Sequence, residues 1–313
     1  MLVHIGYGKA GSSWLQHHLR KPESGFFVAP RWIYFEGTRG EREFYDEFVR
    51  INSLEFDPLP FRRAIQSQLQ TPAAENKIPV VTRERWTGHW FSGGFDTKDL
   101  ADRIHATWPD ARVLIQVREQ RKMLSSVYRQ YVRKGGGRSL SEFFDPPPHG
   151  LGRGPRFQMD HFKYHRIIHY YQKLFGADKV LALPLETIAA NPQAALRSVQ
   201  EFAGAMGAPG LVIEPDPVFP GISAIEAGVK RHLNAFLRRD LVNDFSILCN
   251  GFTQPFAKFA YSCTRRAIPS RVKIRSNKKL EQDIQALVGN FYSDSNRKAA
   301  ELTGIDFLKL GYM

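Results

Sequence analysis

Cysteine is scarce in this sequence: Cys249 and Cys263 are the only two among 313 residues, and they lie 14 positions apart. No histidine or further cysteine flanks either of them at the spacing of zinc ligands, and two thiols do not form a disulfide framework. We therefore expect both to be small buried apolar side chains. No metal site is predicted anywhere in the chain.

Long hydrophobic runs are missing as well. No stretch approaches the roughly 18 to 20 consecutive apolar residues that a membrane-spanning helix needs. The first residues, MLVHIGYGKAGSSW, lack the charged region, the apolar run and the small-residue cleavage site of a secretory signal. These absences predict a cytoplasmic protein, with peripheral attachment at the inner membrane surface as a further expectation.

Acidic residues are lacking in one segment, 253–279, which carries eight basic residues. These are Lys258, Arg265, Arg266, Arg271, Lys273, Arg275, Lys278 and Lys279. The whole chain has 44 Lys and Arg against 31 Asp and Glu, a formal net charge of +13. Such an excess is typical of proteins that meet an anionic partner: nucleic acid, a membrane surface, an acidic glycan or a nucleotide. A solvated basic face is the simpler alternative for this segment.

Apolar runs alternate with helical patterns along the first two thirds of the chain. The runs at 2–5, 78–82, 112–117 and 180–185 predict strands, and apolar residues at helical spacing lie between them. This alternation predicts an α/β fold, a mostly parallel sheet flanked by helices on both faces. Beyond about residue 215 the pattern is helical and basic. We predict one domain over 1–313, with an α/β nucleotide-binding core at 1–210 and a helical C-terminal extension at 211–313.

A glycine-rich turn, GYGKAGSS at 6–13, joins the first strand to the first helix. Glycines let the backbone approach an anion, and a helix start offers free N–H groups and a positive dipole end. Lys9 adds a cation, and Ser12 and Ser13 add hydroxyl donors. The spacing differs from the Walker pattern of nucleotide triphosphatases. A merely structural turn is the alternative.

A second candidate anion site follows the strand at 112–117. Arg118 comes directly after it, and Ser126 lies eight residues further on in the next helix. Open α/β sheets bind ligands at the carboxyl edge of their strands, where Arg118 is expected. Both residues also have simpler interpretations. Arg118 could form an ordinary surface ion pair, and Ser126 could be present in the helix only because its side chain is small.

In these two places the sequence resembles the sulfotransferases that use 3′-phosphoadenosine 5′-phosphosulfate (PAPS). Their 5′-phosphosulfate loop is similar to Lys9-Ala10-Gly11-Ser12-Ser13-Trp14, and their 3′-phosphate motif is similar to Arg118 with Ser126. The segments 170–196 and 295–312 also resemble the family, the latter its bacterial members that act on cell-surface glycans. The resemblance implies a P-loop-like sheet, PAPS as donor, its bisphosphate PAP as product, no metal, and a glycan or glycolipid acceptor.

Transfer of a sulfuryl group needs a base for the acceptor proton and a cation for the leaving phosphate. Lys9 suits the second role. The resemblance implies Glu84, just past the strand at 78–82, as the base, with Glu36 as its rival. The alternative for Glu84 is a salt bridge with Arg83 or Arg85.

The histidines are expected to be structural. His89 lies too far along the chain to match the base, and His161, His165 and His169 step by four along one predicted helix. No acidic residue joins these three, so we interpret them as a helix flank.

Two other functions remain open at this point. One is a phosphoryl-transfer enzyme, although Arg118 stands where such enzymes carry a magnesium-binding Asp. The other is a non-catalytic binder of nucleic acid or of a membrane surface, which leaves both phosphate motifs unexplained. No nucleic-acid partner is therefore expected. The expected partner is an anionic or glycan acceptor, with the segment 253–279 available for peripheral membrane contact.

Overall fold

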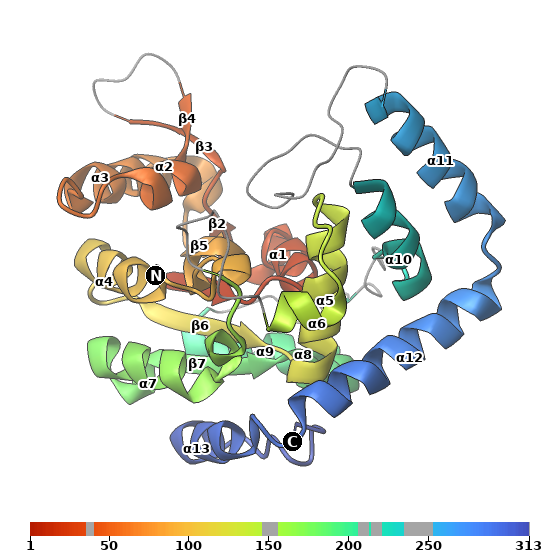
Figure 1. Ribbon diagram of the computed structural model, residues 1–313. Coiled ribbons are helices and arrows are strands. Elements are labelled where there is room, and N and C mark those ends of the chain that lie inside the picture. Colours follow the sequence, from red (N-terminus) through yellow and green to blue (C-terminus); the bar gives the residue numbers. More distant parts are fainter. Residues whose placement is uncertain (36–40, 146–155, 206–212, 214–220, 235–252, 313) are drawn as a thin grey trace.

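A five-stranded, all-parallel sheet lies at the centre of the computed structural model (Figure 1). The structure describes residues 1–35, 41–145, 156–205, 213, 221–234 and 253–312. The strands follow the order β2 (Phe26–Val28), β5 (Ile78–Arg83), β1 (Leu2–Gly6), β6 (Arg112–Val117) and β7 (Val180–Pro184). A short antiparallel pair, β3 (Trp32–Tyr34) and β4 (Glu41–Glu43), stands apart from the sheet. The four runs predicted as strands are confirmed.

Alternate side chains of the central strands enter two separate cores. Val3 and Ile5 of β1 belong to the larger one, whereas Leu2 belongs to the smaller one. The smaller core is formed with α1 (Ser12–Leu19), α8 (Leu185–Ala190) and α9 (Pro192–Ala203). The other face packs against α2 (Phe44–Arg50), α3 (Pro58–Leu69), α4 (Thr97–Thr107), α5 (Gln120–Arg133), α6 (Leu140–Phe144) and α7 (Tyr164–Phe175). The prediction of an α/β sheet covered on both faces is therefore confirmed.

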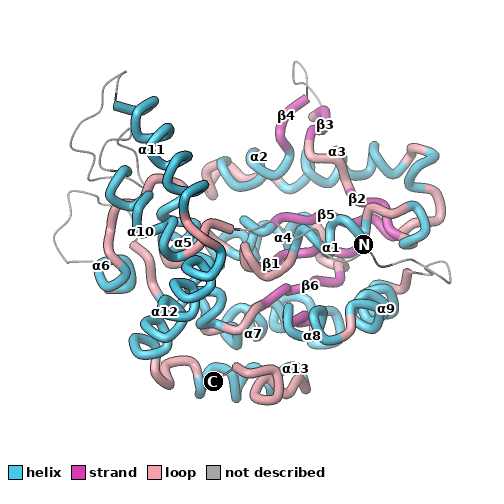
Figure 2. The backbone as a smooth tube through the Cα atoms, turned by 90° about the vertical axis from the view of Figure 1, so that its right-hand side faces the viewer, coloured by secondary structure: helices cyan, strands magenta, loops and turns pink. Residues whose placement is uncertain are grey.

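Beyond residue 221 the described elements are helices. These are α10 (Ala224–Leu233), α11 (Thr253–Ala267), α12 (Ser270–Val288) and α13 (Ser293–Thr303). Both views place α10, α11 and α12 to one side of the sheet, with α13 near the C-terminus (Figures 1 and 2). Phe307 and Tyr312 are buried in the larger core, so the end of the extension packs back onto the α/β layers.

Both cysteines belong to the C-terminal extension. Cys263 is exposed on α11, so the prediction that it is buried is wrong; the helix turns this position away from the faces that pack on α10. Cys249 lies outside the described residues. Among the helices that the structure describes, none combines the length and the apolar character needed to cross a bilayer.

Candidate active site

The candidate site lies at the carboxyl edge of the sheet. β1 pairs with β5 on one side and with β6 on the other, and Ile5 is in register with both Arg83 and Ile115. The three strands therefore end at the same level, and the segments that follow them meet above β1. This is where open parallel sheets bind ligands, between strands whose connections run in opposite directions.

The glycine-rich turn adopts a conformation suited to anion binding. Gly11 is the N-cap of α1 with φ 91°, and Lys9 also has a positive φ of 77°. A lysine rarely adopts this left-handed conformation, and such residues concentrate at functional sites. In the described chain the backbone amides of Ser12 and Ser13 donate to no backbone carbonyl. The turn thus directs open N–H groups and the positive end of α1 toward one place.

Two side chains hold the turn by close contact with its glycines. A Cβ on Gly8 would lie 2.3 Å from the indole of Trp90, and one on Gly11 would lie 2.6 Å from Leu185 Cδ1. Ala10 and Trp14, which match the sulfotransferase motif, are both buried, and Trp14 also lines the pocket at the strand ends. Glycine is therefore required at positions 8 and 11 for packing, and at position 11 for backbone conformation as well.

Buried polar side chains support the turn from below. His4 Nδ1 lies 2.7 Å from Thr82 Oγ1, and His4 Nε2 lies 3.2 Å from Gln116 Oε1. Gln16 of α1 donates to Thr82 Oγ1 over 3.0 Å. Burial lowers the pKa of His4 to about 4, so the imidazole is neutral at physiological pH. These hydrogen bonds tie the first helix to the ends of β1, β5 and β6.

Arg118 and Ser126 come together as their spacing suggested. Arg118 Nη1 donates to Ser126 Oγ and to the carbonyl of Lys9, both over 3.0 Å. The contact is possible because α5 begins at Gln120, so that its second turn returns Ser126 toward the strand end. The second candidate anion site is thus adjacent to the turn, in the same pocket.

This pocket has a volume of about 390 Å³ and is strongly cationic. It is lined by Lys9, Ser12, Ser13, Glu84, Arg118, Ser126, Arg129 and Arg133, together with Leu185 and Ile222. Partial removal from water, followed by the charges of Arg133 and Arg129, lowers the pKa of Lys9. Burial likewise lowers the pKa of Arg129, with Arg118 adding to the effect. These neighbouring positive charges repel one another, and an anion bound among them would compensate this repulsion.

Sequence reasoning missed Arg129 and Arg133. Both follow Ser126 on α5, at three and seven positions beyond it, and therefore share its helix face. That spacing was the available signal. The apolar periodicity of this helix alone gives no sign of the two arginines.

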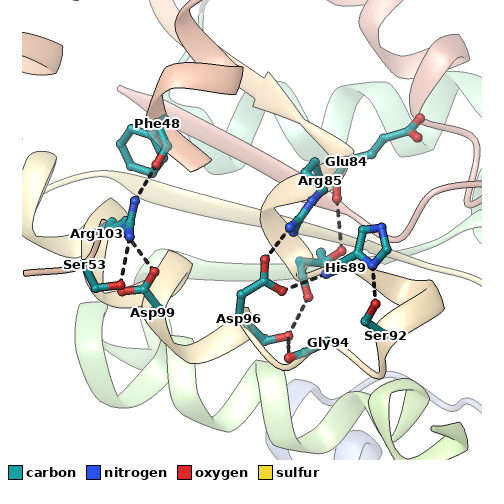
Figure 3. A network of polar contacts seen from close by, with 12 residues as sticks. Phe48, Ser53, Glu84, Arg85, His89, Ser92, Gly94, Asp96, Asp99 and Arg103 are labelled. Atoms are coloured by element: carbon teal, nitrogen blue, oxygen red, sulfur yellow. Dashed lines mark hydrogen bonds and ion pairs between the residues drawn. The ribbon is translucent and has the colours of Figure 1, made fainter. Parts of the chain in front are cut away.

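Glu84 begins a short 3-10 turn, η3 (Glu84–Thr87), directly after β5. Its carboxylate accepts a hydrogen bond from Ser12 Oγ. The salt-bridge alternative does not hold within the described chain, because Arg85 pairs with Asp96, and Arg83 pairs with Glu43 and Asp46. Figure 3 shows the Glu84 carboxylate extending away from Arg85 and His89. Its rival, Glu36, lies outside the described residues.

The histidines are placed differently from expectation. His161 lies in a separate turn, η5 (Met159–Phe162), ahead of α7, so the prediction of one helix carrying His161, His165 and His169 is wrong. The cause is tertiary: the His161 ring packs 4.9 Å from that of Tyr7. The His89 ring is hydrogen-bonded to Ser92 Oγ, and the backbone amide of His89 donates to Asp96 Oδ1 (Figure 3). Both contacts fit the structural role predicted for His89. Within the described residues, no three His, Cys, Asp or Glu side chains gather as a metal site would require.

Comparisons with known proteins give limited similarity. A sulfotransferase from Alicyclobacillus acidocaldarius aligns with a TM-score of 0.44 and 18% identity, over 81% of this chain and 98% of its own. The sulfotransferase domain from the curacin biosynthetic pathway aligns with a TM-score of 0.42 and 12% identity, over 83% of this chain and 96% of its own. No family model and no curated protein matches the chain. Similarity at this level establishes neither a family nor an activity.

Proposed function

We propose that this protein is a sulfotransferase that moves a sulfuryl group from PAPS to a hydroxyl or amine of an acceptor, a glycan or glycolipid. One observation carries the proposal: the turn at Lys9–Ser13 and the pair Arg118–Ser126 line a single pocket that also holds Glu84. A nucleotide with anionic groups at both its 5′ and its 3′ position matches two anion sites in one cavity. The resemblance of both motifs to PAPS-dependent enzymes points to the same donor.

The residues of the pocket fit such a donor. Ser12, Ser13 and Lys9 would hold the 5′-phosphosulfate at the start of α1, and Arg118 with Ser126 would hold the 3′-phosphate. Arg129 and Arg133 add two further cations to the same wall. Four cationic side chains supply the positive charge that phosphoryl-transfer enzymes take partly from magnesium.

Glu84 would act as the base. Its carboxylate takes the proton of the acceptor O–H or N–H while the acceptor atom bonds to sulfur. The bond from sulfur to the bridging phosphate oxygen breaks, and the electron pair leaves with the 3′,5′-bisphosphate. Lys9 and the open amides of Ser12 and Ser13 stabilise the charge that develops on the leaving phosphate. Ser12, hydrogen-bonded to Glu84, fixes the carboxylate between donor and acceptor.

The basic segment 253–279 has a different proposed role, peripheral contact with an anionic membrane surface at the cytoplasmic side. Phe259 and Ile274 are exposed on α11 and α12, and Arg266, Arg271 and Arg275 are exposed near them. Exposed apolar side chains flanked by cations are the pattern of interfacial helices.

The test of the main proposal is a comparison of nucleotides. Calorimetry should give tighter binding for adenosine 3′,5′-bisphosphate than for ADP by about 10- to 100-fold, because only the former has the 3′-phosphate that Arg118 would bind. Transfer from labelled PAPS to a panel of glycosides, measured by mass spectrometry of the products, should persist in the presence of EDTA. Equal affinity for the two nucleotides, or a loss of transfer that magnesium restores, would contradict the proposal.

A further inference from the structure

A second cavity, of about 490 Å³, lies on the other side of Glu84. Glu84 lines both cavities, so this one borders the place where an acceptor would meet the base. Its wall combines four arginines with two aromatic rings: Arg20, Arg31, Arg83, Arg85, Tyr45 and Trp90. Glu84 is the only acidic side chain among its lining residues in the described chain.

Acidic side chains behind the wall hold three of these arginines in place. Glu43 binds Arg31 at 2.5 Å and Arg83 at 3.6 Å, and Asp96 binds Arg85. Glu43 and Asp96 are only 9% and 12% exposed and do not line the cavity, whereas Arg31 is 57% exposed. The carboxylates therefore face the protein, and the guanidinium groups of Arg31 and Arg83 stay exposed at the cavity. A guanidinium fixed in advance loses little entropy when it binds an oxyanion.

The arginines retain donors for a ligand. Arg83 reaches its acidic partners through Nη2, and Arg31 reaches Glu43 through Nε, which uses a minority of the five N–H groups on each. Arg85 offers less, because its Nη1 is buried and its Nη2 is bound by Asp96. Arg20 contacts only the carbonyl of Gln16, at 3.5 Å, and has no carboxylate within ion-pair distance among the described residues.

The charge balance also favours an anion. Asp46, behind the wall, is shared with Arg50, so five arginines stand against four acids, Glu43, Asp46, Glu84 and Asp96, and the balance is one positive charge. Once Glu84 has taken the acceptor proton it is neutral, and the balance rises to two positive charges. An oxyanion on the acceptor therefore meets the most favourable field at the moment of transfer.

Two aromatic side chains complete the cavity. The Tyr45 ring lies under Arg83, with 5.5 Å from the guanidinium carbon to the ring centroid. Trp90 rests on Gly8 of the phosphate turn and is half-buried, so part of its indole remains open to the cavity. Aromatic faces beside polar donors are suited to the flat faces of sugar rings.

We propose that this cavity is the acceptor subsite and that it selects acceptors bearing an oxyanion, a carboxylate or a sulfate or phosphate ester, bound by Arg20, Arg31 and Arg83. This inference rests on the proposed sulfotransferase function. The acceptor keeps its anionic group against the arginines and presents a hydroxyl or amine to Glu84. The chemistry of transfer is unchanged, and what the cavity adds is selection of an acidic sugar over a neutral one.

The experiment measures acceptor binding separately from transfer. Wild-type protein saturated with adenosine 3′,5′-bisphosphate is titrated with four methyl glycosides. These are the glucoside, the glucuronide, the glucoside 6-sulfate and the glucoside 6-phosphate. Binding is measured by calorimetry and followed by tryptophan fluorescence, to which Trp90 contributes as one of five tryptophans. At least one anionic glycoside should bind about 10-fold or more tightly than the neutral glucoside. The three anionic arms show which oxyanion the cavity prefers.

Arg20→Gln provides the decisive variant, and we expect it to fold normally because Arg20 is exposed and its side chain contacts the Gln16 carbonyl at 3.5 Å. It should remove a large part of the preference, weakening the anionic glycoside by about 3- to 10-fold and the neutral one hardly at all. Arg197→Gln is the matched control: Arg197 is exposed on α9 and does not line this cavity. Equal binding of all four glycosides, or equal effects of the two variants, would overturn the inference.

Failure of the sulfotransferase proposal would look different. If the bisphosphate does not bind tightly and no acceptor is sulfated, the proposed function fails, whatever the glycosides do. If the bisphosphate binds and transfer to a neutral glucoside is as efficient as to every anionic one, the function holds and only the acceptor inference fails.

Discussion

Two regions of this protein are rich in positive charge, and they differ in how the charge is arranged. In the pocket, Lys9 follows β1, Arg118 follows β6, and Arg129 and Arg133 come from α5, so distant parts of the chain converge on about 390 Å³. In the segment 253–279, eight cations lie in one continuous run along α11 and α12. The run is the more conspicuous of the two in the sequence, whereas the pocket has fewer cations but gathers them.

The difference lies in solvation. The pocket removes Lys9 and Arg129 from water sufficiently to lower the pKa of both groups. On α12, by contrast, Arg271, Arg275 and Lys278 are exposed. Exposed charges are screened over about 8 to 10 Å in physiological salt, whereas converging and partly desolvated charges are not. Selective recognition is therefore expected in the pocket, and long-range, salt-sensitive attraction is expected along the segment.

The largest effect should come from Glu84, the carboxylate that lines the pocket. Glu84→Gln keeps the size of the side chain but removes its basicity, so kcat should fall by about 10²- to 10⁴-fold. The affinity for adenosine 3′,5′-bisphosphate should stay near that of the wild type, since Glu84 does not neutralise the nucleotide. Steady-state kinetics with an established acceptor and calorimetry measure the two quantities.

Glu36→Gln is the companion variant. If Glu36→Gln is inactive while Glu84→Gln keeps the wild-type kcat, the base has been assigned to the wrong carboxylate. If both variants remain fully active, the acceptor proton goes to water or to another group.

The fold was largely predictable because its signals are local. Each buried parallel strand is a short apolar run, and the helix starts are marked by capping residues, as at Asn191, which accepts from the amide of Ala194. The strand order was not predictable from such patterns, since β5 inserts beside β1 through contacts distant in sequence. His161 shows the same limit: its spacing suited a helix, but packing against Tyr7 placed it in a separate turn.

The candidate site was predictable only where a short motif carried it. The turn at Lys9 to Ser13 and the pair Arg118–Ser126 are local in sequence, and the structure brings them into one pocket. Their roles stay predictions. The arginine-lined cavity was not predictable, because Arg20, Arg31, Arg83 and Arg85 come from separate elements and no motif joins them. Their pairing with Glu43 and Asp96 exists only in three dimensions.

The second prediction concerns the buried histidine below the pocket, a group that the basic segment does not have. The folded-state pKa of His4 is about 4, below its ordinary 6.5. Between these two pH values the unfolded chain binds a proton that the folded chain does not, so stability falls as the pH falls. The loss from His4 amounts to on the order of 3 kcal/mol and is complete below pH 4.

Urea unfolding between pH 7 and pH 4 measures this loss. His4→Gln should reduce the loss of stability between pH 7 and pH 4 by about the same amount. Burial also lowers the pKa of His161 to about 4, so the variant should keep a pH-dependent loss of similar size from His161. An unchanged pH dependence in His4→Gln would show that His4 takes up its proton without cost to the fold.

The third prediction compares one arginine from each region. Arg118→Ala removes a charged contact in the pocket and should weaken binding of adenosine 3′,5′-bisphosphate by about 10- to 100-fold, with little change for ADP. Arg271→Ala, from the exposed run, should leave both affinities within about twofold. Calorimetry on the four combinations of variant and nucleotide decides the matter. Equal losses in the two variants would mean that total charge, not its convergence, binds the donor.

The smallest effect on transfer is expected from the basic segment itself. Arg266, Arg271, Arg275 and Lys278 are exposed and, among the described residues, form no ion pair, unlike Lys273, which pairs with Glu226. Replacing all four with Gln should leave donor affinity and transfer to a soluble acceptor within about twofold. Binding to phosphatidylserine vesicles should weaken by roughly 1 kcal/mol per charge at low salt, and phosphatidylcholine vesicles serve as the control. The difference should fade as salt rises, because exposed charges are screened. If the four changes instead weakened donor binding as much as Arg118→Ala does, the run and the pocket would act as one electrostatic surface, and the distinction between them would not hold.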